Sequence, residues 1–137
     1  MKIQYLDTSI VIPFLHGILG TKEQRASKKN TKAVAYVRKA RAKLRISVAT
    51  YAEALRGSEM DEDIADFIVE EFDSPLQLTE RHARRWARLQ YRSERVMGDN
   101  DAWNAALAVA ENGVVVGHDE EAFNDRPDLE YIDYMKA

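Results

Sequence analysis

The sequence predicts a three-layer α/β/α fold, in which helices cover both faces of a central parallel sheet of about four to five strands. Short apolar segments alternate with longer stretches whose apolar residues recur at helical spacing, and this alternation is typical of βαβ units. One segment, residues 114–116, is apolar throughout, as expected for a strand buried on both faces. The 137 residues contain no linker-like stretch, so we expect one domain over residues 1–137.

The first predicted unit is a strand followed by a helix. Residues 3–6 form a short apolar segment that ends at Asp7, which predicts a buried strand. Thr8 and Ser9 then begin a helix that continues to Gly17. The first strand therefore places an acid at its carboxyl end.

The next part of the chain is basic and then acidic. Residues 20–32 are polar and basic without periodicity, and they predict a loop. Helical spacing predicts a helix over residues 31–42, and alternation predicts a strand over residues 44–48. We expect two further helices over residues 50–57 and 60–72, the second with acids in its first turn, where the helix dipole favours them.

The second half of the chain predicts two helices and further strands. Residues 75–78 and 129–132 predict short strands, and residues 79–97 predict a long helix. An Ala-rich run over residues 100–112 predicts another helix, which Gly113 ends as a left-handed cap. Five arginines share one face of the long helix: Arg81, Arg85, Arg88, Arg92 and Arg95.

The composition excludes several classes of protein. No apolar stretch approaches the ~20 residues that span a bilayer, and the N-terminus lacks the apolar core of a signal peptide. The chain has no cysteine, which excludes disulfides, cysteine metal sites and a cysteine nucleophile. We therefore expect a cytoplasmic protein without a membrane partner.

Charge is segregated along the chain, although the net charge is only −3. Residues 20–56 hold 11 Lys and Arg against 2 Glu, and residues 80–95 hold 6 Arg against 2 Glu. Residues 57–73 hold 8 acids and no base, and residues 98–137 hold 10 acids against 2 bases. Solvated faces are the simpler interpretation of any one block, whereas the whole pattern suits a polyanion partner beside an acidic, cation-binding centre.

Four acids are predicted to meet at one edge of the sheet. The functional cleft of a parallel sheet lies at the carboxyl ends of its strands, where Asp7 and Asp119 follow predicted strands. Glu53 and Asp101 lie near the starts of predicted helices at the same edge. Clustered carboxylates repel each other, and a hard cation such as Mg²⁺ or Mn²⁺ relieves that repulsion. The cluster therefore indicates hydrolysis of a phosphodiester by a metal-activated water.

Each of these acids also has a structural interpretation. Asp7 and Asp101 could cap the helices that follow them. Thr50 and Glu53 have the spacing of a capping box, which is as good an interpretation of Glu53 as a metal ligand. Asp119 lies in a polar turn, where an exposed Asp is common.

Four motifs in order resemble those of the PIN-domain ribonucleases, specifically the VapC-like toxins of type II toxin–antitoxin modules. Leu-Asp-Thr-Ser, at residues 6–9, resembles the opening motif of that family. Residues 47–57 resemble the second motif, and residues 100–108 resemble the third. Val-Gly-His-Asp, at residues 116–119 and followed by Phe123, resembles the fourth. The resemblance implies the PIN-like variant of a Rossmann-like fold.

The resemblance also implies roles for these residues. The acids of the first three motifs, Asp7, Glu53 and Asp101, would hold Mg²⁺ or Mn²⁺, and Asp119 would be the fourth acid. Thr8 or Ser9 would support the site by adding a hydroxyl near it. The implied activity is endonucleolytic cleavage of RNA, neutralised by a cognate antitoxin that lays a helix into a groove and inserts a basic residue into the site. A homodimer and a toxin–antitoxin complex are typical of the family.

The chain departs from the family pattern at Asn104, where an apolar residue is usual, and at Gly117, where Thr is frequent. Asn104 lies three residues after Asp101, close to the same helix face. It could hydrogen-bond an acid or a metal-bound water, or simply face the rim. Asp99 is expected to be the helix cap or an acid just outside the metal site.

The arginine face has two interpretations, a solvated face and an RNA contact. Arg92 and Arg95 lie nearest to the Ala-rich helix and are the best candidates for a phosphate contact. His118 lacks the spacing of a metal ligand.

Two other classes of function compete with a nuclease. A haloacid-dehalogenase-like phosphatase needs a second Asp where Ser9 stands, and a response-regulator receiver needs a Lys that residues 110–124 lack. A non-catalytic RNA- or protein-binding module on a PIN-like fold is the remaining alternative. It would be favoured if the four acids did not converge.

Overall fold

The computed structural model describes residues 1–91 and 93–137, so the predicted RNA contact Arg92 lies outside the described residues. A parallel four-stranded sheet with the order β2-β1-β3-β4 forms its centre. The strands are β1 (Gln4–Leu6), β2 (Leu44–Arg45), β3 (Val114–Gly117) and β4 (Glu130–Asp133).

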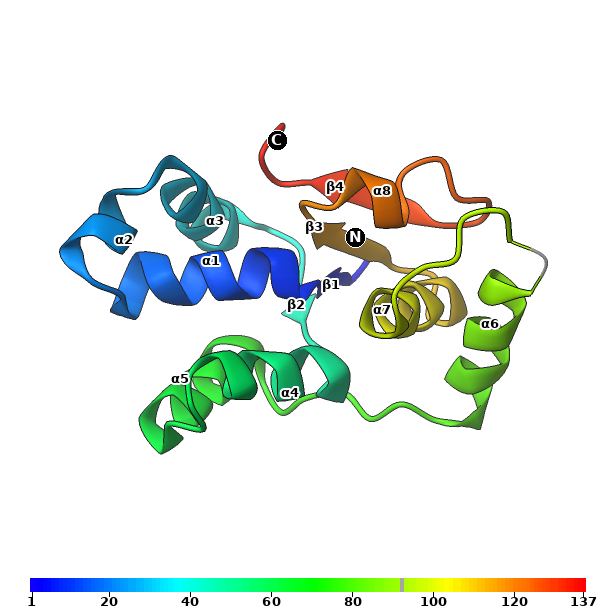
Figure 1. The fold of residues 1–137 in the computed structure, drawn as a ribbon, viewed down its shortest axis with the longest axis horizontal. Coiled ribbons are helices and arrows are strands. Elements are labelled where there is room, and N and C mark those ends of the chain that lie inside the picture. Colours follow the sequence, from blue (N-terminus) through cyan, green and yellow to red (C-terminus); the bar gives the residue numbers. More distant parts are fainter. Residues whose placement is uncertain (92) are drawn as a thin grey trace.

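Helices cover both faces of this sheet (Figure 1), which confirms the predicted three-layer fold class. The first five are α1 (Thr8–Leu19), α2 (Lys22–Ala26), α3 (Lys28–Lys39), α4 (Val48–Gly57) and α5 (Glu62–Phe72). The others are α6 (Glu80–Gln90), α7 (Asp99–Ala110) and α8 (Glu120–Phe123). None of the helices in the described part of the chain is both long and apolar enough to cross a membrane.

The central strands are buried on both sides because their alternate residues enter two separate apolar clusters. Leu6 and Val116 pack with α1 in one cluster. Tyr5 and Val115 pack with α7 in the other. Successive side chains of a strand point to opposite faces, so the continuous apolar runs of β1 and β3 serve both layers.

The predicted loop over residues 20–32 is wrong. Thr21 and Gln24 form a reciprocal capping box that begins α2, and α3 begins at Lys28. The basic residues of this region therefore lie on two helices rather than on a loop. The polar sequence hid the helices because α2 buries none of its five residues.

The strands predicted on either side of α4 are shorter than expected. Strand β2 ends at Arg45, and residues 46–48 do not continue it. The segment around residues 75–78 contributes only an isolated parallel bridge between Leu76 and Ser47. The sheet therefore has the lower of the two predicted strand numbers.

The long helix predicted over residues 79–97 is also too long. Helix α6 ends at Gln90, and Arg95 lies in the segment that leads to α7. Gln90 closes this segment, because its side chain accepts from the Met97 N–H at 3.0 Å and donates to the Met97 carbonyl at 2.7 Å. The predicted arginine face consequently does not extend to Arg95.

Helix α7 ends at Ala110, two residues before the predicted end, and the left-handed residue lies one position earlier than predicted. Asn112, with φ of 54°, adopts the left-handed conformation that was expected of Gly113. Gly113 is required for a different reason, because a Cβ built there would lie 2.4 Å from the ring of Tyr5.

Candidate active site

Asp7 lies where β1 ends and α1 begins. Its N–H donates to the Val116 carbonyl at 2.8 Å, which ties it to the carboxyl end of β3. Its side chain is only 3% exposed and is the N-cap of α1. The capping interpretation is therefore correct, and it coexists with a position at the edge of the sheet where ligands bind.

Both carboxylate oxygens of Asp7 accept hydrogen bonds. Oδ2 accepts from the Ser9 N–H at 3.1 Å and from the Ser9 hydroxyl at 2.6 Å. Oδ1 accepts from Nδ2 of Asn104 at 2.9 Å. The Ser9 hydroxyl in turn accepts from the N–H of His118 at 2.9 Å, so Ser9 connects the first and fourth motifs.

Asn104 is the buried centre of this network, with 1% of its surface exposed. Its Oδ1 accepts from the hydroxyls of Ser47 at 2.9 Å and Thr50 at 3.2 Å. These donors fix the orientation of the amide, because its oxygen faces the hydroxyls and its nitrogen faces Asp7. Of the alternatives left open for Asn104, the hydrogen bond to an acid is the one observed.

Glu53 is not part of a capping box. The N-cap of α4 is Ser47, which accepts from the Thr50 N–H at 3.2 Å, so Glu53 lies in the second turn of the helix. Its Oε1 accepts from the Thr8 hydroxyl at 2.7 Å. Thr8 thus holds Glu53 beside the start of α1, next to Asp7.

Asp101 lies in the first turn of α7 and is half-buried. Gly98 is the N-cap of this helix, so Asp99, an exposed residue, is not the cap. Burial raises the pKa of Asp101 to about 7, with further contributions from the charges of Asp7, Asp119 and Glu53 and from a hydrogen bond with Asp7. The four predicted acids are therefore close enough to act on one another.

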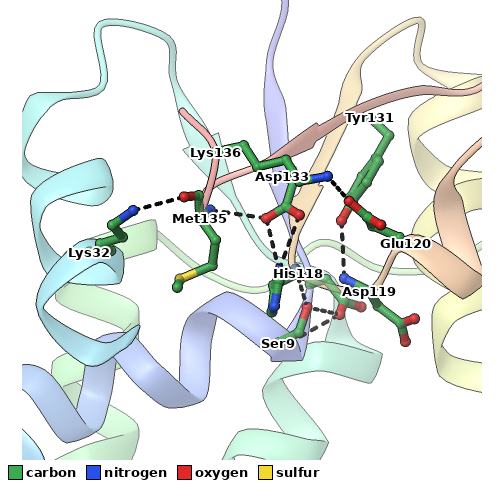
Figure 2. Close-up of polar contacts among 10 residues, drawn as sticks. Ser9, Lys32, His118, Asp119, Glu120, Tyr131, Asp133, Met135 and Lys136 are labelled. Atoms are coloured by element: carbon green, nitrogen blue, oxygen red, sulfur yellow. Dashed lines mark hydrogen bonds and ion pairs between the residues drawn. The ribbon is translucent and has the colours of Figure 1, made fainter. Parts of the chain in front are cut away.

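Asp119 has a structural role as well. It is the N-cap of the short helix α8, accepting from the Ala122 N–H at 3.1 Å. Its own N–H donates to the hydroxyl of Tyr131 at 3.0 Å (Figure 2). Asp119 and Asp101 line one cleft of about 380 Å³, together with Arg95.

His118 and Asp133 form a pair that sequence reasoning missed. Nδ1 of His118 lies 2.9 Å from Oδ1 of Asp133, whose side chain is 6% exposed (Figure 2). His118 follows β3 and Asp133 ends β4, so their meeting depends on the neighbouring positions of these strands. Only knowledge that β3 and β4 are neighbours in the sheet would have allowed Asp133 to be predicted beside His118.

The acids fit a hard divalent cation by chemistry and charge. All four supply carboxylate oxygens, the donors preferred by Mg²⁺ and Mn²⁺, and their mutual repulsion is the condition that a cation relieves. Among residues 1–91 and 93–137, however, no three acidic or histidine side chains are already arranged to hold one ion. The oxygens of Asp7 instead face the donors of Ser9 and Asn104.

A family model for the PIN domain matches residues 4–129 of this sequence. No curated protein matches it significantly. Three solved structures have a similar fold. The first is FitAcB from Neisseria gonorrhoeae, with a TM-score of 0.72, 17% identity, and coverage of 98% of this chain and 99% of that one.

The second is VapBC-1 from nontypeable Haemophilus influenzae, with a TM-score of 0.71, 23% identity, and coverage of 96% of this chain and 98% of that one. The third, VapBC-5 from Mycobacterium tuberculosis, is described as a member of the VapBC family of toxin–antitoxin systems. It has a TM-score of 0.56 and 23% identity, and the match covers 96% of this chain and 98% of that one. At these identities the likeness concerns the fold.

Proposed function

Because the chain belongs to the PIN domain family, we propose that it is a metal-dependent endoribonuclease and the toxin of a type II toxin–antitoxin pair. The observation that carries this proposal is the environment of Asp101. Burial and three other acids raise its pKa to about 7, which is typical of an acidic site prepared for a cation. Because the chain belongs to the PIN domain family, it is neither a haloacid-dehalogenase-like phosphatase nor a response-regulator receiver.

Asp7, Glu53 and Asp101 would hold Mg²⁺ or Mn²⁺, with Asp119 as the fourth acid. When bound, the metal would activate a water and stabilise the negative charge that develops on the phosphate. The chain's own residues orient the ligands. Thr8 holds Glu53, and the other donors described above hold Asp7.

Burial and the neighbouring acids raise the pKa of Asp101 to about 7, so a fraction of the Asp101 carboxyl groups is protonated near neutral pH when no cation is bound. Binding of a divalent cation would favour the ionised form of Asp101, which would then release its proton. Arg95 lines the same cleft as Asp101 and Asp119, and this position supports the proposal that Arg95 contacts a phosphate of the RNA. Arg92 stays a prediction from the sequence.

The antitoxin partner is supported by the fold likeness to proteins of toxin–antitoxin systems. A groove of about 190 Å³ lies between α1, α2, α4 and α5, and it is lined by Ile12, Leu15, Leu19 and Ile64 among others. Leu19 is 48% exposed, as suits a surface that a partner covers. We propose that an antitoxin helix lays its apolar face here. A homodimer stays a prediction.

One observation favours the alternative of a non-catalytic RNA-binding module. In the described part of the chain no group of three metal-ligating side chains is preformed. A nuclease and a binding module therefore differ in whether the acids rearrange around a cation and whether RNA is then cut.

The experiment is cleavage of labelled cellular RNA by the purified chain with Mn²⁺, compared with EDTA. We expect cleavage only with the metal, and we expect Asp7→Asn to abolish it while leaving the circular dichroism spectrum unchanged. Asp66→Asn, which removes one carboxylate from the exposed side of α5, is the matched control and should cleave normally. Equal cleavage by Asp7→Asn and the wild type would refute the mechanism.

A further inference from the structure

Arg95 and Arg126 line the cleft that contains Asp101 and Asp119, and both donate hydrogen bonds to the segments beside it. Arg126 donates from Nε to the Ala122 carbonyl at 2.8 Å and from Nη1 to the Ser93 hydroxyl at 3.2 Å and to the Arg95 carbonyl. Arg95 donates from Nη2 to the Asn124 carbonyl at 2.7 Å. The segment between α6 and α7 is thus fastened to the segment after α8 through neutral acceptors, and both guanidinium charges remain uncompensated by these bonds.

A second cleft adjoins the first at Arg126. The cleft of about 380 Å³ that contains Asp101 and Asp119 has Arg126 in its wall. Arg126 also lines a neighbouring cleft of about 270 Å³, whose other cations are Arg85 and Arg88 of α6. The cleft that holds Asp101 and Asp119 and the cleft that holds Arg85 and Arg88 therefore adjoin at Arg126.

The arginines of α6 fall into two groups. Arg81 pairs with Glu111 at 3.0 Å, and Arg84 pairs with Glu80 at 3.1 Å. Within the described residues, Arg85 and Arg88 form no ion pair, and neither do Arg95 and Arg126. The one acid in the second cleft is Asp128. The helix thus neutralises the cations outside the cleft and leaves those inside it available to an anion.

Arg126 lies close to a second positive charge, that of Arg95. Burial lowers its pKa, and the charge of Arg95 lowers it further. Two like charges held close together by carbonyl oxygens are stabilised by an anion between or beside them. Phosphate is an anion that guanidinium groups commonly bind, and Nη2 of Arg126, which takes part in none of the bonds described above, can donate to a phosphate oxygen.

We propose that Arg85, Arg88 and Arg126 bind the sugar–phosphate backbone of single-stranded RNA on one side of the phosphate that is cut at the acids. A cationic groove that tracks the backbone is the usual means of binding a single strand. The reference to cutting rests on the function proposed above. The binding itself does not, because it needs only the cleft.

A second basic region provides the rival site. Helix α2 and the start of α3 lie at the opposite end of the molecule from α6 (Figure 1). They carry four basic residues: Lys22, Arg25, Lys28 and Lys29. None of these four residues lines the cleft that contains Asp101 and Asp119. RNA bound at α2 and α3 would therefore not occupy the two clefts that adjoin at Arg126.

The experiment measures fluorescence anisotropy of a labelled single-stranded RNA of roughly 12 nucleotides, a length within the range of single-strand binding sites. The full chain carries Asp7→Asn, and EDTA is present, so that no RNA is cut. On this background we compare Arg85→Gln/Arg88→Gln with Arg25→Gln/Lys28→Gln, which removes the same charge at the rival site. Thermal melting confirms that each variant is folded.

We expect Arg85→Gln/Arg88→Gln to weaken binding roughly tenfold and to reduce the slope of log K against log salt by about 1.4, the loss of two phosphate contacts on a single strand. The rival variant should keep the slope of the parent. A normal slope in Arg85→Gln/Arg88→Gln, or a larger loss in the rival variant, would overturn the proposal. So would the absence of RNA binding by the parent.

Cleavage by the chain with an intact Asp7 separates this proposal from the proposed function. If Arg85→Gln/Arg88→Gln raises KM and leaves kcat within about twofold, the arginines bind RNA away from the reacting atoms. If Arg85→Gln/Arg88→Gln reduces the salt slope of RNA binding but the wild type never cuts RNA, the proposed nuclease activity is contradicted and the proposed RNA-binding cleft is supported. If the wild type cuts RNA and Arg85→Gln/Arg88→Gln leaves the salt slope of RNA binding unchanged, the proposed RNA-binding cleft is contradicted and the proposed nuclease activity is supported.

Discussion

At the scale of the residue, Asn104 is a side chain that acts on the candidate site through its hydrogen bond to Asp7. Its Nδ2 donates to Asp7, and its Oδ1 accepts from Ser47 and Thr50. An apolar residue in its place would leave Asp7 without one donor and the Ser47 hydroxyl without its acceptor. Asn104 is therefore a positioning residue for Asp7.

We expect Asn104→Leu to lower kcat or Mn²⁺ affinity by roughly 10- to 100-fold, as loss of a ligand's hydrogen-bond partner does. It should also lower the free energy of unfolding by about 1–3 kcal/mol. Ser47→Ala is the matched control, because it removes a partner and a helix cap but keeps the bond to Asp7. If both variants lose activity in proportion to their stability, Asn104 has no separate role in positioning.

Asp101 predicts an unusual dependence of stability on pH. Its pKa is raised from 3.8 to about 7, so the folded chain keeps the proton where the unfolded chain has lost it. In EDTA, stability should fall as pH rises from about 4 to about 7, and the penalty should be complete above 7. Asp101→Asn removes the ionisable group, so its Tm should exceed that of the wild type at pH 8.

Thermal melting of both chains across this range measures the effect. The difference in Tm should grow with pH and should shrink when Mn²⁺ is added to the wild type. Parallel curves for the two chains would show that Asp101 does not carry the charge penalty.

The acids themselves were predictable, whereas their supporting residues were not. Asp7 and Asp119 follow short apolar segments, and the carboxyl ends of parallel strands meet at one edge. The bond from Ser47 to Asn104 joins residues 57 positions apart, on two helices whose relative placement the sequence pattern does not specify. For the same reason the pairing of His118 with Asp133 was missed.

At the scale of the element, the errors of prediction arose where a local signal was weak or absent. The segment after α6 contains neither Gly nor Pro until Gly98, so the periodicity of its arginines seemed to continue. The segment that follows the helix is instead held by Arg126, more than 30 residues away, which donates to the Ser93 hydroxyl and the Arg95 carbonyl. In contrast, the capping box that begins α2 was present in the sequence as Thr21 and Gln24.

The junction of α7 and β3 makes a prediction about stability. Gly113→Ala should lower the free energy of unfolding by about 1–3 kcal/mol, because its Cβ would clash with Tyr5 in a packed core. Gly57→Ala, whose Cβ would lie 3.4 Å from Ile12, is the control and should cost less. Urea unfolding measures both, and equal midpoints would show that the core beside Tyr5 yields without cost.

At the scale of the whole molecule, the segregated charges of the sequence become separate regions of the fold. The carboxyl edge of the sheet collects acids from α1, α4, α7 and the turn after β3. Arg85 and Arg88 of α6 line a cleft that adjoins, at Arg126, the cleft holding Asp101 and Asp119. Parallel strands with crossover helices bring together acids that are more than 100 residues apart, which no local motif could do.

Mn²⁺ binding measured by isothermal titration calorimetry, on the wild type and on Asp7→Asn/Asp101→Asn, tests the central claim that the four acids form one metal centre. We predict saturable binding by the wild type with release of protons near pH 7, and no saturable binding by the variant. Equal heats and stoichiometry in the two chains would contradict the account, because the acids would then not be the ligands.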